Sequence, residues 1–384
     1  MRLTSEHAVM PRSTGCIVQC PLIFRPYLPV LMNSLSELAS ATKQNDFAYF
    51  RELNARLGTL KAANYDVASK CNLRCEGCLF FEGEENEGHE DSRSLAEWDA
   101  LFAADAARGV TLAYMAGAEP SLVPDRLRAA QKYIPHGIVF TNGTIRLPDD
   151  IFYRIHISSW GVDEIGSSLR AGDVLTKAMN NYRDDPRAVC VFTITSLNIN
   201  QIMIMAELAN SHGLPLTFSY FSPTTRYLDK LESKADNDKA YFRISSATQS
   251  LALTQADFAH AREEIVRAML AYPETVQYSL HYDDWVTGDK LYDIDPVTKI
   301  AKNCGFRVTK QVHVHVDHQP GKGKCCSSNI DCSNCRAYAM GQSTYLSRIR
   351  EAVRKPEELA KWIEVREIWA SLFLNADQSA TARR

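Results

Sequence analysis

Residues 64–78 read NYDVASKCNLRCEGC and join a candidate strand to three closely spaced cysteines. The stretch from Asn64 to Ser69 has the short, mixed apolar character of a buried strand. Cys71, Cys75 and Cys78 follow it directly, in a C-x3-C-x2-C arrangement. In parallel α/β proteins the chemistry lies in the loops at the carboxyl ends of the strands. This stretch therefore predicts a strand that runs into a reactive loop.

The residues that follow alternate between strand and helix patterns. Ser94 and Glu97 form a capping-box pattern at the start of one helix. Alternation at this spacing predicts βα units, and hence an α/β fold: a partial (β/α)6 barrel of parallel strands with helices outside, or an open wound sheet. The expected strands cover 64–69, 110–115, 137–140, 155–158, 188–195 and 216–221, and the expected helices cover 95–107, 124–133, 149–153, 169–182 and 200–212.

Outside this repeating region the pattern changes. Residues 1–61 read as an N-terminal helical segment, with helical spacing at 31–40 and 47–57. The βα core spans 62–222, and a helical connecting region with a strong helix at 256–271 spans 223–300. Residues 301–384 form a small cysteine-rich α+β extension, with an alternating strand at 311–316 and a final helix at 358–374.

The composition is that of an ordinary globular protein. Of 384 residues, 45% are hydrophobic and 23% charged, and the net charge is −3. These values give no sign of a nucleic-acid partner or a membrane surface. The apolar stretch 17–32 contains Arg25 and three prolines, which disfavour both a signal sequence and a membrane span. We therefore expect a cytoplasmic protein in which the clustered members of its 11 cysteines bind metal rather than form disulfides.

The first cysteine group has the chemistry of an iron–sulfur site. Cysteine thiolates ligate such clusters, and three of them on one short loop leave one iron of a [4Fe–4S] cluster open to a ligand. Zinc is the alternative, but structural zinc sites take four protein ligands, and His89 is the only further candidate nearby. The alternative of three unrelated buried cysteines is disfavoured by their regular spacing.

In spacing and context, Cys71, Cys75 and Cys78 resemble the signature of the radical S-adenosylmethionine (SAM) superfamily. The resemblance extends over residues 62–222. It implies that SAM chelates the open iron, that an electron from the cluster cleaves SAM, and that the resulting 5′-deoxyadenosyl radical abstracts hydrogen from a substrate. Gly77 departs from the family, which often has an aromatic residue there. Phe80 or Phe81 are candidates for the missing contact with adenine.

The same resemblance implies contacts to SAM at later strand ends. Residues 116–120, AGAEP, are similar to the family's Gly-Gly-Glu-Pro motif, where small residues let the backbone approach the ligand. The resemblance adds the TNG turn at 141–143, the serine pair Ser158 and Ser159, and Arg170, whose guanidinium is suited to a carboxylate. Simple turns, caps and a surface charge are the alternatives. The expected SAM-binding residues are Ala116, Gly117, Ala118, Glu119, Asn142, Ser158 and Arg170.

A second cysteine group lies near the C-terminus. It resembles the twitch or SPASM extensions of radical SAM enzymes, which implies an auxiliary [4Fe–4S] cluster; a structural zinc knuckle is the alternative. We expect the sequence around His313 and His315 to form a hairpin strand, and do not count either histidine, or His318, as a ligand. The candidate ligands are Cys304, Cys325, Cys326, Cys332 and Cys335, whereas Cys16, Cys20 and Cys190 are interpreted as structural.

The resemblance implies an enzyme that acts on a small molecule, with a flavodoxin- or ferredoxin-type electron donor as its partner. A peptide-modifying enzyme and an enzyme that transfers the adenosyl group are alternatives. The first 60 residues look too short and too helical for the leader-binding domain of many peptide modifiers, which favours a small molecule. A zinc-binding scaffold protein is the alternative from a different class.

Overall fold

The computed structural model describes residues 46–57, 60–82, 87–288, 291–321 and 330–375. The expected helix at 31–40, the cysteines Cys16 and Cys20, and the candidate ligands Cys325 and Cys326 lie outside this part of the chain. Residues 48–384 form one compact unit, and residues 1–47 are assigned to another.

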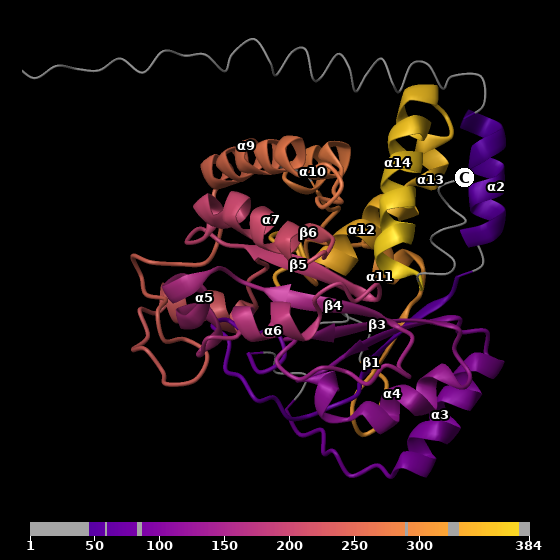
Figure 1. Cartoon of the computed structure of the whole chain (residues 1–384), viewed down its shortest axis with the longest axis horizontal. Coiled ribbons are helices and arrows are strands. Elements are labelled where there is room, and N and C mark those ends of the chain that lie inside the picture. The colour runs from indigo at the N-terminus through magenta and orange to yellow at the C-terminus, as the bar shows by residue number, and fades with distance from the viewer. Residues whose placement is uncertain (1–45, 58–59, 83–86, 289–290, 322–329, 376–384) are drawn as a thin grey trace, which may run out of the picture. The chain divides into compact units, whose positions relative to one another are not determined.

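Within the described residues, one sheet of seven strands runs through the larger unit (Figure 1). Its order is β6-β5-β4-β3-β2-β1-β7, and every neighbouring pair is parallel. The strands are β1 Ala62–Asp66, β2 Leu112–Ala116, β3 His136–Thr141, β4 Arg154–Ser159, β5 Ala188–Ile194, β6 Leu216–Tyr220 and β7 Val312–Val314. The predicted α/β class is confirmed, and all six predicted core strands form.

The connections between the first six strands carry the helices that a parallel sheet requires. Ser94 and Glu97 form the expected capping box at the start of α3. The helices and 3-10 turns of the core are α3 Leu95–Ala107, η2 Pro120–Leu122, α4 Pro124–Gln131, α5 Asp163–Arg170, α6 Leu175–Asn181, η3 Ile199–Gln201 and α7 Ile202–Ser211.

The remaining helices precede and follow this core. Before it lies α2 Asp46–Leu57. After it come α8 Thr225–Glu232, α9 Gln255–Ala271, α10 Leu280–Val286, α11 Gly305–Val308, α12 Tyr338–Ser347, α13 Ile349–Ala352 and α14 Pro356–Phe373. The expected helices at 47–57, 256–271 and 358–374 therefore form as α2, α9 and α14.

Two expected helices differ from the structure. Residues 149–153 form a turn and irregular chain rather than a short helix. Of the expected helix 169–182 only α6 forms, and α5, which was not predicted, ends at residue 170 because Ala171 has a left-handed backbone (φ 57°). A left-handed residue at this position is a common helix C-terminus, and Gly172 follows it.

The alternating segment 311–316 also differs from the prediction. Rather than forming a hairpin strand within a separate unit, β7 pairs in parallel with β1, with His313 opposite Asn64. Among the described residues of this segment, a single antiparallel bridge, between Val314 and Pro320, forms where the chain turns back. The sheet therefore extends beyond the six core strands on its β1 edge.

The C-terminal helix α14 is fixed to the sheet through its last turn. Carbonyl groups in the last turn of a helix have no partner within it. Arg154 on β4 donates to the carbonyl oxygens of Ser371 (3.0 Å) and Leu372 (3.3 Å), and His156 Nε2 lies 2.8 Å from the Leu372 oxygen. These contacts fix α14 to the centre of the sheet.

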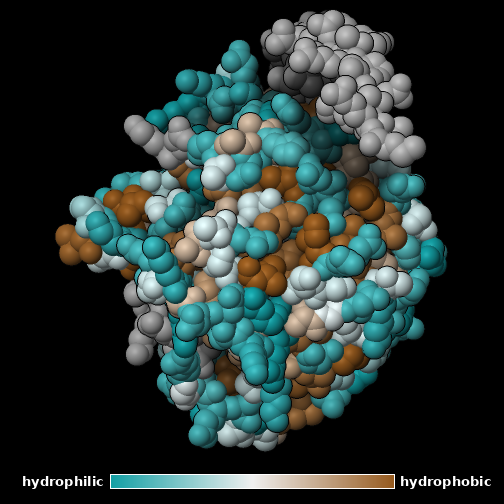
Figure 2. Space-filling model, turned by 90° about the vertical axis from the view of Figure 1, so that its left-hand side faces the viewer, coloured by the Kyte–Doolittle hydropathy of each residue, from teal (hydrophilic) through white to brown (hydrophobic). Residues whose placement is uncertain are grey.

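Hydrophilic and hydrophobic residues are interspersed over the face of the molecule that Figure 2 shows. Large apolar side chains are mainly in the interior, and those that are exposed are scattered along the chain, such as Leu95, Ile204 and Val297. Among the described residues, every helix is too short or too polar to span a bilayer.

Candidate active site at the carboxyl ends of the strands

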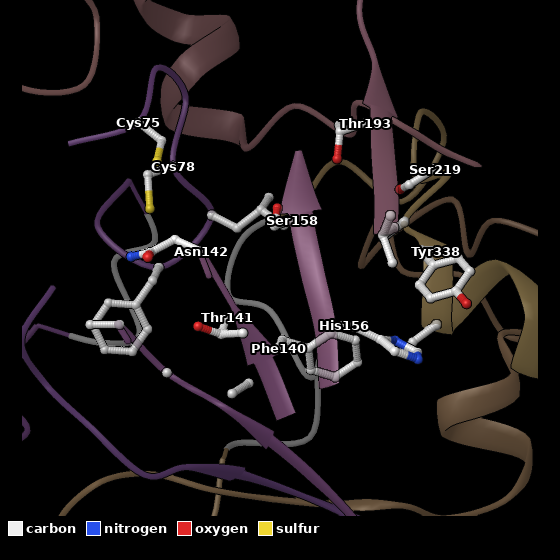
Figure 3. Close-up of a pocket in the computed structure, with 18 of the residues that line it drawn as sticks. Cys75, Cys78, Phe140, Thr141, Asn142, His156, Ser158, Thr193, Ser219 and Tyr338 are labelled. Carbon is white, nitrogen blue, oxygen red and sulfur yellow. The ribbon is translucent and has the colours of Figure 1, made fainter. Parts of the chain in front are cut away.

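A cavity of about 320 Å³ lies where the strands end. It is lined by residues of all seven strands or of the loops that follow them, and by the start of α12. Figure 3 shows Cys75, Cys78 and Asn142 on one side of it, and Thr193, Ser219 and Tyr338 on the other. Because residues from both halves of the sheet line one cavity, the sheet curves around it as a partial barrel does.

The loop that carries Cys71, Cys75 and Cys78 follows β1, and all three side chains line the cavity. Glu76 lies within this loop and is fully buried. Its carboxylate accepts hydrogen bonds from the backbone N–H groups of Arg243 (2.7 Å) and Ser245 (3.0 Å). A buried carboxylate with such partners holds a loop firmly, because breaking the contact leaves buried polar groups unpaired.

Gly77 has a structural reason to be glycine. Its backbone is left-handed (φ 57°), and a Cβ atom there would lie 3.0 Å from the Phe221 ring. An aromatic side chain at this position, frequent in the radical SAM family, would not fit here. Of the two suggested replacements, Phe80 lines the cavity, whereas Phe81 stacks on Tyr241 with ring centroids 5.0 Å apart.

Burial disfavours the thiolate forms of Cys71 and Cys78 in this loop. Burial raises the pKa of Cys71, and burial raises the pKa of Cys78 to about 12. The backbone N–H of Leu73 donates to Cys71 Sγ (3.3 Å), which partly offsets this. Metal binding would have to displace the thiol protons and supply the positive charge that stabilises the thiolates.

The AGAEP stretch at the end of β2 brings backbone close to the cysteine loop. Gly117 has a φ of 106°, and a Cβ there would lie 2.7 Å from the Ala68 carbonyl oxygen. The next N–H, of Ala118, donates to that same oxygen (2.9 Å). Only glycine permits this approach. Ala116, Gly117, Ala118 and Glu119 all line the cavity.

Glu119 joins the ends of β2 and β3. It is buried, and its carboxylate accepts hydrogen bonds from Thr141 Oγ1 (2.6 Å) and from the backbone N–H of Asn142 (2.8 Å). The Asn142 side chain in turn donates to Asn72 Oδ1 (2.8 Å) and lies 3.8 Å from Cys71 Sγ. A continuous set of hydrogen bonds therefore runs from β2 through β3 to the cysteine loop.

Ser158 and Arg170 approach each other in the wall of the cavity near the cysteine loop, where the backbone N–H of Glu76 donates to the carbonyl oxygen of Leu169 (2.7 Å). Arg170 Nη1 lies 3.4 Å from Ser158 Oγ, and its guanidinium lies 5.9 Å from the centre of the Trp160 ring. Among the described residues that line the cavity, Arg170 is the only arginine or lysine. Ser159 points elsewhere, toward the Cys190 thiol (3.3 Å), as the alternation of side chains along a strand requires.

Several polar residues of the cavity were not singled out from the sequence. They come from the strands β4, β5 and β6 and from α12, and they are His156, Thr193, Ser219 and Tyr338. Burial lowers the pKa of His156 to about 3, so its imidazole is neutral. His156, Thr193 and Ser219 lie one or two residues before the predicted ends of their strands, and this position could have identified them from the sequence. Tyr338 is far from these strands in the sequence, so it carried no such signal.

The described members of the second cysteine group, Cys304, Cys332 and Cys335, are not among the residues that line the cavity. Cys304 caps α11 without a side-chain cap bond, Cys335 is buried, and Cys332 is partly exposed. Burial raises the pKa of Tyr292 far above its usual value, and Cys304 and Cys335 both lie near enough to raise it further. The structure therefore brings these two cysteines near the same tyrosine.

The sequence matches no protein-family model and none of the curated proteins. Solved structures with a similar fold include SuiB from Streptococcus suis, at 12% identity and a TM-score of 0.47, over 69% of this chain and 62% of that one. SuiB bound to S-adenosylmethionine aligns at 12% identity and a TM-score of 0.48, over 76% of this chain and 69% of that one. Native anSMEcpe with bound AdoMet aligns at 12% identity and a TM-score of 0.45, over 84% of this chain and 94% of that one.

The chain thus spans 62% of the first of these SuiB structures, less than two thirds of its length. At 12% identity these are distant likenesses of fold.

The hydrogen bonds of Glu119 lead to a first prediction. In Glu119→Gln the amide nitrogen cannot accept a hydrogen bond, so the backbone N–H of either Ser121 or Asn142 loses its partner. We expect a loss of about 1–3 kcal/mol in the free energy of unfolding and a lower iron content after anaerobic reconstitution. Chemical denaturation and iron analysis measure the two effects. The exposed Glu164→Gln in α5 is the control, and parental stability and iron content in Glu119→Gln would contradict the prediction.

Proposed function

We propose that this chain is a radical SAM enzyme that binds a [4Fe–4S] cluster through Cys71, Cys75 and Cys78 and binds SAM beside it. One observation carries this proposal. The three cysteines and all seven residues that the resemblance assigns to SAM line a single cavity at the carboxyl ends of parallel strands. A cluster held there would supply the electron for SAM cleavage, and the protein supplies orientation and shielding from water.

The arrangement of the thiols favours a cluster over a zinc ion. Around one tetrahedral zinc, with bonds of about 2.3 Å, sulfur ligands lie about 3.8 Å apart. Within the described residues, neither cysteine group brings three ligand atoms within 4.8 Å of one another, whereas Asp66, His313 and His315 do so. In a [4Fe–4S] cluster each cysteine binds a different iron, which separates the sulfur atoms.

The remaining walls suit the parts of SAM. Arg170 offers a guanidinium for the carboxylate, and such pairs are bidentate and strong. The backbone near Gly117 is open to a close approach by the ligand's amino group. Ser158, within 3.4 Å of Arg170, is available to a ribose hydroxyl.

The far side of the cavity favours a small, polar substrate. Thr193 and Ser219 lie across the cavity from the cysteine side, and the ring of Tyr338 lies near them with its hydroxyl directed away from the cysteines (Figure 3). A few polar groups in a mostly apolar wall are typical of a small-molecule site. We infer hydrogen abstraction from such a substrate, with a flavodoxin- or ferredoxin-type protein as electron donor. Peptide modification and adenosyl transfer remain the alternative reactions for the same site.

We further propose an auxiliary [4Fe–4S] cluster ligated by four of Cys304, Cys325, Cys326, Cys332 and Cys335. Two observations support this. Cys304 and Cys335 both lie near Tyr292. A turn joins Cys332 to Cys335, and the backbone N–H of Cys335 donates to the carbonyl oxygen of Cys332 (3.4 Å). Full ligation by protein would leave this cluster closed to SAM and suited to electron transfer.

Replacement of Cys71 tests the main proposal. Cys71→Ala removes one of three ligands, so the anaerobically reconstituted variant should form no detectable 5′-deoxyadenosine from SAM and dithionite. Liquid chromatography with mass spectrometry measures the product. Cys190→Ala is the matched control, because that thiol is buried on β5 and does not line the cavity. Undiminished 5′-deoxyadenosine formation by a folded Cys71→Ala protein would refute the proposal.

Iron content tests the auxiliary cluster separately. The parent protein should contain about eight irons per chain, and the double variant Cys332→Ala with Cys335→Ala, which leaves only three of the five candidate ligands, about four, with SAM cleavage retained in the absence of substrate. Circular dichroism must show that the variant is folded, since cluster loss can unfold a small cysteine-rich region. About four irons in the parent, or about eight in a folded double variant, would remove the auxiliary cluster from the proposal.

A further inference from the structure

Three buried side chains converge in the wall of the cavity, away from the cysteine loop. Asp66 ends β1, His313 lies on β7, and His315 follows directly after it. The three are 3–5% exposed, and one candidate ligand atom from each lies within 4.8 Å of the others. β7 brings the histidines here, because its parallel pairing with β1 aligns the ends of the two strands.

One carboxylate oxygen is shared by both imidazoles. Asp66 Oδ2 lies 2.7 Å from His313 Nε2 and 3.4 Å from His315 Nδ1. Two ligand atoms bound to the same ion at about 2.1 Å are separated by about 3.0 Å at a right angle and about 3.4 Å at the tetrahedral angle. The 3.4 Å separation equals the tetrahedral value, whereas the 2.7 Å separation is a hydrogen-bond distance and would have to lengthen by about 0.3 Å to reach the right-angle value once a metal ion replaces the imidazole proton.

The residue types of the cluster also suit a cation. Two imidazoles and one carboxylate form the donor set typical of zinc and of non-haem iron(II).

The surroundings hold both imidazoles in place. His89 stacks on His315 with ring centroids 4.0 Å apart, and its own Nδ1 lies 2.8 Å from Asp317. On the other side, the Gly321 N–H donates to the His313 carbonyl oxygen (2.7 Å), and a Cβ on Gly321 would lie 3.2 Å from His313 Nδ1. These contacts restrict the orientation of both imidazoles.

The position of the cluster gives it access to two cavities. Asp66 and His313 line the large cavity, and Asp66 and His315 line a neighbouring pocket of about 160 Å³. We propose that Asp66, His313 and His315 bind a divalent transition-metal ion of the Zn²⁺ or Fe²⁺ class. Three protein ligands leave at least one coordination position open. An oxygen atom of a substrate in the large cavity is the ligand that this position would accept.

Zinc binding by the full-length, cluster-loaded protein tests this site, with a readout independent of SAM cleavage. After addition of Zn²⁺ and desalting, the parent should retain about one zinc per chain, and X-ray absorption should show only nitrogen and oxygen ligands, at about 2.0–2.1 Å. Asp66→Asn and His315→Gln should each weaken zinc binding by at least about tenfold in a chelator competition.

His318→Asn is the matched control, because His318 lies in the same segment but packs on Trp98, and its zinc binding should equal that of the parent. Three results would overturn the proposal: no retained zinc in the parent, sulfur ligands in its absorption spectrum, or parental zinc affinity in Asp66→Asn. If His315→Gln fails to fold, zinc should still raise the melting temperature of the parent, and the absence of such a rise would also count against the site.

Discussion

The buried carboxylate of Glu119 is the contact on which the geometry of the proposed active site depends. Parallel pairing aligns the carboxyl ends of the strands, but it does not fix the loops that follow them. Glu119 binds Thr141 and Asn142, and Asn142 reaches Asn72 and Cys71. Three successive strand ends are joined in this way, and the adjacent Gly117 allows the close backbone approach. In the proposed function, these contacts position the cysteine loop relative to SAM.

Much of the fold could be predicted because it is encoded locally. The apolar runs and the capping box of Ser94 and Glu97 predicted α3 and all six core strands, with small errors at their ends. The spacing of the three cysteines and the AGAEP and TNG stretches predicted which strand ends line the cavity. Each of these signals occupies a few consecutive residues and needs no knowledge of distant contacts.

The remainder depends on contacts between segments far apart in the sequence. The segment around His313 alternates as a hairpin strand does, and nothing local indicates that it pairs with β1, almost 250 residues earlier. The convergence of Asp66 with two histidines follows from that pairing alone. Tyr338 likewise reaches the cavity only because α14, fixed to β4 through Arg154, and α12 pack beside the sheet. The break between α5 and α6 arises from the left-handed backbone of Ala171, and Gly172, which follows it, was a local signal for the end of a helix.

The central claim is that one iron held by the Cys71 loop is open and binds SAM directly. Electron paramagnetic resonance of the anaerobically reconstituted and dithionite-reduced protein, with and without SAM, tests it most directly. A ligand on that iron changes its coordination, so SAM should alter the signal of one [4Fe–4S] cluster in the parent and have no effect on any signal that remains in Cys71→Ala. An iron-loaded, reduced parent protein whose spectrum is unchanged at saturating SAM would contradict the account.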